Sequence, residues 1–155
     1  MNRQHVFNTV ARHLLTQAEM CFGQNPNPTH PEDEGICLYY SQATGHRCAI
    51  GALIPDHLYR PEMENEALIA LLDDYPALTR HLELEPRAQY QHRTLENTPD
   101  IQFLDDLRKV HDISTLQSWP VDLTVLAHRY GLNDDVVREL EHEFLDKITE
   151  EEVLD

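Results

Sequence analysis

Helical periodicity is the feature that most restricts the fold of this chain. Apolar residues recur at spacings of three and four over most of the sequence, as they do on the buried face of an amphipathic helix. Prolines and glycines interrupt the pattern and mark where one helix ends or another begins. The helical segments predicted in this way are residues 3–20, 61–72, 78–82, 98–110, 119–130 and 134–152. No periodicity is found over residues 84–97.

One stretch departs from the helical pattern, at about residues 36–50. Apolar and aromatic runs flank a Ser-to-Gly segment, which is typical of two short strands joined by a tight turn. A four-residue loop would place Cys37 opposite Cys48 and Tyr39 opposite His46. The predicted fold class is therefore α+β, predominantly α-helical, with five to six helices and one short two-stranded β-hairpin.

Length and charge limit what the chain can bind. Its 155 residues are expected to form a single globular domain, residues 1–155. It has 28 acidic and 12 basic residues, a formal net charge of -16. Such a charge repels phosphate backbones and anionic lipid surfaces, so direct binding to nucleic acid or membrane is not expected. A basic protein, or the basic groove of a nucleic-acid-binding complex, is the predicted partner, and the oligomeric state stays open.

Cysteine usage favours a reducing compartment. The chain has three cysteines, an odd number, and lacks an apolar segment at its N-terminus. No window approaches the roughly 18 apolar residues that a membrane-spanning helix needs. We therefore expect a cytoplasmic protein.

The predicted hairpin contains the candidate metal ligands Cys37, His46 and Cys48. Thiolates and imidazoles are the ligands that zinc prefers, but structural zinc sites show compact pairs of cysteines that this sequence lacks. Free cysteines are also commonly buried as small hydrophobic residues. No cofactor is therefore predicted, with zinc as the alternative.

A second interpretation makes Cys48 a nucleophile. The segment after it could begin a helix, whose positive end lowers the pKa of a thiol. His111 is the candidate base and Asp56 a further polar residue of such a site. His111 falls on the apolar face of its helix, where a histidine is more often a satisfied core residue. Asp112 follows it directly and is not expected to orient the ring, because adjacent helical residues do not face each other.

The C-terminal helix, at about residues 134–152, concentrates the acidic residues. From residue 134 to 155 there are ten acids and two bases, a net charge of -8. Most of the acids lie opposite the apolar stripe, where they are either simply solvated or imitate the phosphates of DNA for a basic groove. The candidate partner-binding residues are Asp134, Asp135, Glu139, Glu141, Glu143, Asp146, Glu150 and Glu151.

A longer motif runs through the chain. It reads Cys37-x-x-Tyr40, then Gly45-x-x-Cys48-Ala49-x-Gly51-x-Leu53-Ile54-Pro55-Asp56-x-x-Tyr59, then Glu64 and Leu71-Leu72, and later Phe103-Leu104-x-x-Leu107-x-x-x-His111-Asp112 with Trp119. With this motif the chain resembles, over about residues 3 to 132, an uncharacterised family of small proteins found in bacteriophage, prophage and bacterial genomes. The resemblance implies a phage or mobile-element context and no particular mechanism. If the chain is encoded by a phage, its expected location is the cytoplasm of the host cell.

Two functions follow as hypotheses. The favoured one is a non-enzymatic acidic accessory protein of phage or prophage type that binds and inhibits or modulates a host protein, such as a nucleic-acid-binding defence complex, through a DNA-mimicking carboxylate surface. The alternative is a Cys/His-dependent hydrolase or zinc-binding protein that uses Cys37, His46 and Cys48 together with His111.

Overall fold

The computed structural model describes residues 1–27, 35–84 and 99–154, and for residues 150–154 only the helical backbone. Within these residues the chain has six α-helices and one two-stranded antiparallel sheet. The predicted class, α+β and predominantly helical, is confirmed. The prediction for residues 84–97 falls almost wholly outside the described residues, as does residue 98, the first residue of the predicted helix 98–110.

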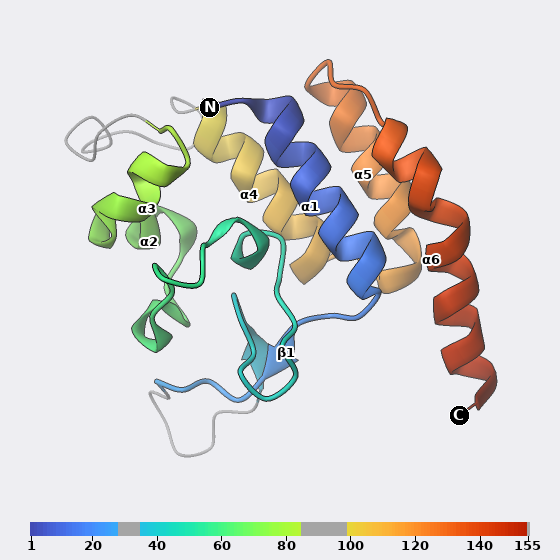
Figure 1. The fold of residues 1–155 in the computed structure, drawn as a ribbon, viewed down its shortest axis with the longest axis horizontal. Helices are drawn as coiled ribbons and strands as arrows, with labels where there is room; N and C mark the ends of the chain where they lie inside the picture. Colours follow the sequence, from blue (N-terminus) through green and yellow to red (C-terminus); the bar gives the residue numbers. More distant parts are fainter. Residues whose placement is uncertain (28–34, 85–98, 155) are drawn as a thin grey trace.

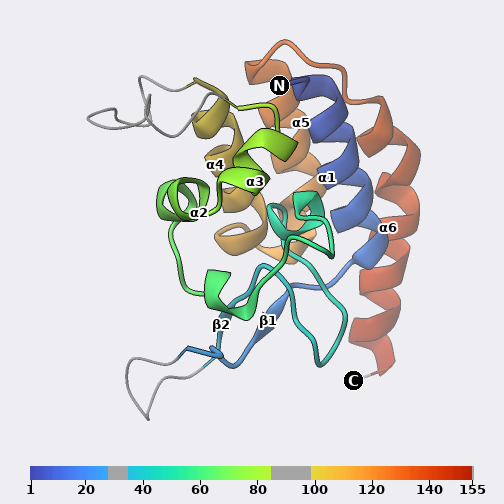
Figure 2. The ribbon, with the colours of Figure 1, turned by 60° about the vertical axis from the view of Figure 1, so that its left-hand side comes forward.

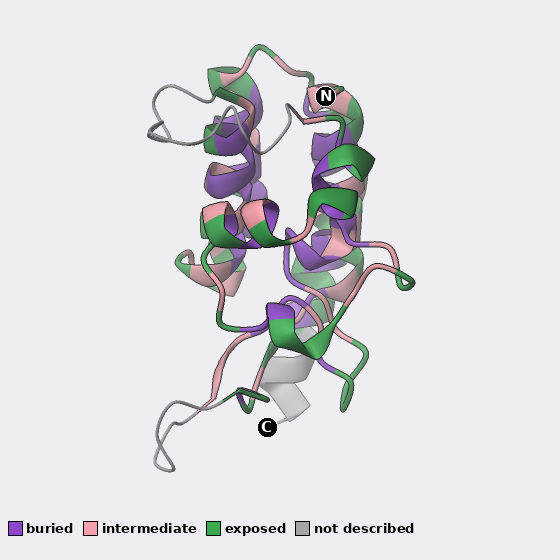
Figure 3. Ribbon diagram, turned by 90° about the vertical axis from the view of Figure 1, so that its left-hand side faces the viewer, coloured by how far each residue is buried: buried purple, intermediate pink, exposed green. Residues whose placement is uncertain are grey.

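Four long helices carry most of the core: α1 (Arg3–Gln17), α4 (Pro99–Asp112), α5 (Trp119–Arg129) and α6 (Asp135–Leu154). α1 is central, because it contacts α4, α5 and α6 (Figure 1). Buried residues line the inner faces of the helices and exposed residues their outer faces (Figure 3). The predicted apolar stripes are therefore the faces that pack together.

The helix ends show why these segments begin and stop where they do. The Asn2 side chain accepts a hydrogen bond from the His5 backbone N–H at 3.0 Å and so caps the start of α1. α1 ends before its predicted limit at residue 20, because Ala18 adopts a left-handed conformation with φ of 54°. Gly131, with φ of 67°, follows α5 as predicted, because glycine adopts this conformation without steric cost.

The helix predicted over residues 61–72 divides into two pieces. Residues Pro61–Met63 form a single 3-10 turn, η2, and the α-helix α2 starts only at Leu68 (Leu68–Asp74). Between them Asn65 has a φ of 69°, which a continuous helix cannot include. A short helix follows directly, α3 (Pro76–His81), where proline occupies the first helical position.

The sheet uses a strand that sequence analysis missed. β2 (Ile36–Cys37) pairs with β1 (Phe22–Gly23), with Phe22 opposite Cys37 (Figure 2). The predicted pairing of Cys37 with Cys48 is therefore wrong. Residues 40 and 47 form a single isolated bridge, and the chain then turns into the 3-10 helix η1 (Gly51–Leu53) instead of continuing as a strand.

Trp119 lies at the junction of three helices. It is fully buried at the start of α5, and its ring stacks on Phe144 of α6 with centroids 6.0 Å apart. The ring of His111 of α4 also lies next to the indole, with centroids 5.5 Å apart. Of the helices in residues 1–27, 35–84 and 99–154, none combines the length and apolarity that crossing a bilayer requires.

Candidate functional site

The segment that follows β2 turns back on itself in a register different from the predicted one. The Cys48 N–H donates to the Tyr39 carbonyl at 3.2 Å, and Tyr40 is bridged to Arg47. Tyr39 is therefore opposite Cys48, and not opposite His46. The shift of two positions separates the two cysteines that sequence analysis had paired.

Gly51 explains how this segment enters the core. A Cβ atom at Gly51 would lie 1.7 Å from the carbonyl oxygen of Tyr39, a backbone atom that cannot move aside. Only glycine allows the two backbones to approach so closely. The contact places Cys48, Ala49 and Ile50 in the hydrophobic core.

Cys48 lacks the properties of a nucleophile. Its side chain is buried, and its sulfur accepts a hydrogen bond from the Gly51 N–H at 3.3 Å. Burial raises the pKa of the Cys48 thiol well above its usual value, because a thiolate would lose its solvation there. The thiol is therefore protonated at neutral pH, as expected of a cysteine that packs as a small hydrophobic residue.

His46 and Asp56 point to other partners. His46 Nε2 lies 3.2 Å from Glu19, and the side chain of Asp56 is 92% exposed in an ion pair with Arg47. Arg47 also donates to the carbonyls of Gly51 and Ile54, each at 3.1 Å. Neither His46 nor Asp56 joins a convergent group with Cys48 and His111, so these two candidates make separate ion-pair contacts and form no shared site.

One group of three metal-ligating residue types does converge within the described part of the chain. It consists of Cys37, His111 and Asp112, whose ligand atoms lie within 4.8 Å of one another. His111 and Asp112 come from the end of α4, and Cys37 from β2. Cys37 and His111 are candidate site residues from the sequence, whereas the presence of Asp112 beside them was not predicted.

The expectation that Asp112 would not orient His111 is wrong. His111 Nδ1 lies 2.6 Å from Asp112 Oδ1. The Cα atoms of adjacent residues are about 3.8 Å apart, so a short carboxylate can fold back onto the neighbouring ring without crossing the helix surface. The rule that adjacent helical residues do not meet applies to side chains that extend away from the helix surface. The Asp112 carboxylate instead folds back toward the His111 ring.

The tautomer of His111 follows from its two hydrogen bonds. Nε2 faces the backbone N–H of Cys21 at 2.8 Å, and because that group is a donor, Nε2 must accept. The proton of the neutral ring is then on Nδ1, where it is donated to Asp112. His111 is fully buried, and both of its nitrogens have a partner.

This tautomer argues against metal binding and against base catalysis at His111. A neutral histidine ligates a metal through the nitrogen that lacks a proton, and here that nitrogen is occupied by Cys21. A general base needs the same free lone pair. Burial, with a smaller contribution from Asp112, also raises the pKa of the neighbouring Cys37 thiol to about 11. The group therefore connects Cys21, the residue before β1, with β2 and the end of α4 as a hydrogen-bonded network.

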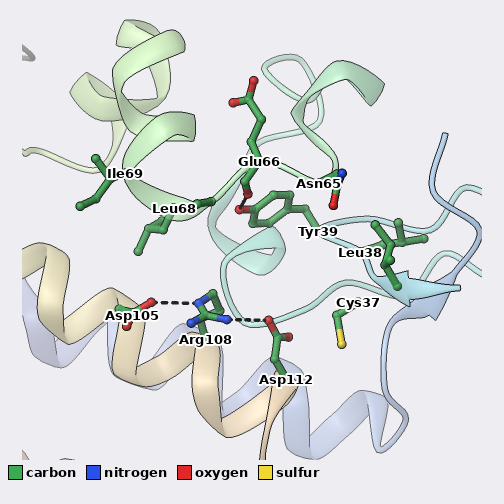
Figure 4. A pocket seen from close by; sticks show the side chains of 12 residues that line it. Cys37, Leu38, Tyr39, Asn65, Glu66, Leu68, Ile69, Asp105, Arg108 and Asp112 are labelled. Atoms are coloured by element: carbon green, nitrogen blue, oxygen red, sulfur yellow. Dashed lines mark hydrogen bonds and ion pairs between the residues drawn. The ribbon is translucent and has the colours of Figure 1, made fainter. Parts of the chain in front are cut away.

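A cavity of about 470 Å³ lies beside this network (Figure 4). Strand β2, the start of α2 and one face of α4 line it. Arg108 lies on its floor between two carboxylates, 2.9 Å from Asp105 and 3.2 Å from Asp112 (Figure 4). The charges of Arg108 and its two partners are therefore already paired within the protein.

Sequence analysis missed the role of Glu64. Its carboxylate is buried and accepts hydrogen bonds from the Tyr39 N–H at 2.8 Å, the Tyr40 N–H at 3.1 Å and the Tyr59 hydroxyl at 2.7 Å. The Tyr40 and Tyr59 rings meet edge to face, and Arg47 lies 4.5 Å from the centre of the Tyr40 ring. Three motif residues, Tyr40, Tyr59 and Glu64, thus meet in a structural clasp with two neighbours. We call this clasp the Glu64 network: Tyr39, Tyr40, Arg47, Tyr59 and Glu64.

The structure separates the acidic residues of the C-terminal helix into buried or partly buried ones and exposed ones. Asp134 is buried and pairs with Arg138 at 3.0 Å and His128 at 3.5 Å, so it is not available to a partner. Glu141 is partly buried. Four candidates are exposed, and we call them the α6 acidic face: Asp135, Glu139, Glu143 and Asp146. The side chains of Glu150 and Glu151 lie outside the described residues.

Comparisons with protein-family models, with curated proteins and with solved structures found no match. The functional proposals below therefore rest on the residues of this chain.

Proposed function

We propose that this chain is a non-enzymatic acidic accessory protein, of phage or prophage type, that binds a basic surface of a host protein through the α6 acidic face. The row of exposed carboxylates on α6 carries the proposal. The motif described above supports the phage or prophage context. A nucleic-acid-binding defence complex is the partner class that this chemistry favours.

The four exposed carboxylates share one side of the helix. Their positions follow one another at intervals of four, four and three residues, which a helix of 3.6 residues per turn places close to a single line. The helix rises 1.5 Å per residue, so the carboxylates are spaced by about 5.5 Å along its axis. One strand of B-DNA carries a charge about every 3.4 Å along its axis. The face is thus somewhat sparser in charge than one DNA strand.

The basic residues near this face are held by the protein. Arg138 pairs with the buried Asp134, and the Lys147 ammonium donates to the carbonyl of Thr16 on α1 at 3.1 Å. Arg12 of α1 pairs with Glu139 at 3.4 Å. This last pair is exposed, and exposed pairs contribute about 0–1 kcal/mol, so a basic partner can replace Arg12 at little cost.

The chemistry of the thiols and of His111 supports a binding function over a catalytic one. Cys37 and Cys48 are held as thiols, and His111 has no free lone pair. A Cys/His hydrolase needs a thiolate and an available base. A zinc site needs a histidine nitrogen that this network already uses.

The test is a pull-down from host lysate over a series of salt concentrations. The variant Glu139→Lys/Glu143→Lys/Asp146→Lys is expected to lose the captured protein. A matched control, Glu62→Lys/Asp74→Lys/Glu83→Lys, makes the same change in net charge at exposed acids elsewhere and is expected to retain it. Capture should weaken steeply with salt, because the interaction is between exposed charges.

Two outcomes separate the parts of the proposal. Equal capture by both variants would exclude the α6 acidic face as the binding surface. If duplex DNA fails to compete with this protein for the captured partner, DNA mimicry is excluded while recognition of a basic surface stands.

A further inference from the structure

The outer face of α5 and the adjoining end of α4 expose an apolar surface. Val121 and Val125, one turn apart on α5, are 61% and 50% exposed, and Ile113, just after α4, is 71% exposed. Single exposed apolar residues are common on proteins, whereas neighbouring ones often mark an interface. Val125 and Ile113 line the same groove, a cavity of about 230 Å³ between α4 and α5.

The charges around this groove balance. Its rim carries two carboxylates and two cations, which are Asp106, Lys109, Asp122 and Arg129. The whole chain has a net charge of -16, so two copies repel each other at most approaches. At this groove the local charge is close to zero, and the apolar floor formed by Val110 and Leu126 is the kind of surface that another helix covers.

The arrangement of charges on α5 also complements itself. A symmetric dimer places the same surface of each copy against the other, so one side chain near the twofold axis meets its own counterpart. With antiparallel α5 helices and the axis at Val125, Asp122 and Arg129 lie on the same flank of the contact, so Asp122 of one copy faces Arg129 of the other. By symmetry, Asp122 of the second copy makes the same contact with the first. Lys109 and Arg129 are 50% and 61% exposed, and each pairs within its own chain, with Asp105 at 3.4 Å and Asp106 at 3.6 Å. Exposed pairs of this kind are weak, so Arg129 can turn to Asp122 of a second copy at little cost.

We propose that this chain forms a symmetric homodimer through the outer face of α5 and the groove between α4 and α5. The two valines and Ile113 form its apolar centre, and the Asp122–Arg129 pairs flank it. The surface is separate from the α6 acidic face, so the dimer would present two such faces. The inference does not depend on the proposed function.

Sedimentation velocity on the full chain, from micromolar to millimolar concentration, tests the dimer. We expect the mass to rise from 18.0 kDa toward twice that value. Added salt should favour the dimer, because it screens the repulsion between the two acidic copies. This is opposite to the salt dependence expected for a basic partner. A mass that stays at 18.0 kDa at every concentration and salt would overturn the proposal.

Substitutions locate the interface. Val125→Glu is expected to keep the protein monomeric. Leu145→Glu also replaces an exposed apolar residue by glutamate, but on α6, and should leave the dimer intact. Both positions are on the surface, and circular dichroism with urea unfolding checks that both variants fold. A dimer that persists in Val125→Glu, or that is lost equally in Leu145→Glu, contradicts the proposed interface.

A charge swap tests the symmetry. Asp122→Arg and Arg129→Asp should each weaken the dimer, because each creates like charges across the axis. The double variant Asp122→Arg/Arg129→Asp should restore it. Failure of the double variant to recover dimerisation, in a protein that unfolds like the wild type, would refute the antiparallel arrangement.

Discussion

Replacing Glu64 by glutamine tests whether the Glu64 network holds the motif segment in place. The substitution keeps the shape of the side chain but exchanges one oxygen for an amide NH2. Glu64 accepts three hydrogen bonds through its two oxygens. In the variant one oxygen can still accept, while the NH2 in either orientation faces a backbone N–H, that of Tyr39 or that of Tyr40, which is a donor.

The magnitude follows from these contacts. A hydrogen bond to a charged group contributes about 1.5–3 kcal/mol, and a buried donor without a partner costs about 1–3 kcal/mol. The variant loses one such bond and weakens the others. Part of the loss is offset because a buried amide is desolvated more cheaply than a buried carboxylate. We expect Glu64→Gln to lower the free energy of unfolding by about 2–4 kcal/mol.

Urea unfolding followed by circular dichroism measures the effect. Tyr59→Phe removes one of the three bonds and should cost about 1–2 kcal/mol. Since both substitutions affect the same bond, the double variant should cost less than the sum of the two. Glu62→Gln, an exposed neighbour, is the control and should change stability by less than about 0.5 kcal/mol. A loss below about 1 kcal/mol for Glu64→Gln, or full additivity with Tyr59→Phe, would refute the reasoning.

Three further predictions concern the same region. The pKa of the native Cys37 thiol is raised from 9.0 to about 11, so at pH 8 this thiol should react with iodoacetamide about 100-fold more slowly than an unperturbed thiol. The variant Asp112→Asn should increase that rate. Mass spectrometry over a pH series measures the rate, and a rate equal to that of an unperturbed thiol would contradict the prediction. Arg47→Ala should lower the free energy of unfolding in urea by about 2–3 kcal/mol, because it removes two hydrogen bonds to carbonyls and the contact with Tyr40. Asp56→Asn should lower it by under about 1 kcal/mol, because it removes only an exposed ion pair. Equal losses in the two variants would contradict this prediction. Gly51→Ala should lower the free energy of unfolding by about 3 kcal/mol or more, since the new Cβ would meet the Tyr39 carbonyl. Near-normal stability in the same assay would contradict the close approach of the Gly51 and Tyr39 backbones.

The long helices could be predicted from sequence because their signals are local. The apolar stripe of α4 and the glycine after α5 each depend on residues within a few turns. The sheet could not be predicted in this way. β1 is two residues long and carries no alternating pattern, and its partner lies on the far side of a proline-rich segment. Register in so short a pair is set by surrounding contacts, not by its own sequence.

The candidate site was harder to predict for the same reason. The tautomer of His111 depends on the backbone of Cys21, which is 90 residues away in the sequence. The buried position of Glu64 depends on Tyr39 and Tyr40, about 25 residues earlier. A charged residue inside a motif was the available signal for Glu64, but residue types alone do not distinguish a buried anchor from a solvated acid.

The position of Trp119 provides a spectroscopic reporter. It is the single tryptophan of the chain, and it contacts α4 through His111 and α6 through Phe144. Its emission should therefore lie toward the blue in the folded protein and shift to the red whenever α6 separates from the other helices. A partner that binds the α6 acidic face without moving the helix would leave the emission unchanged, whereas one that pulls α6 away would reveal itself in the tryptophan spectrum without any added label.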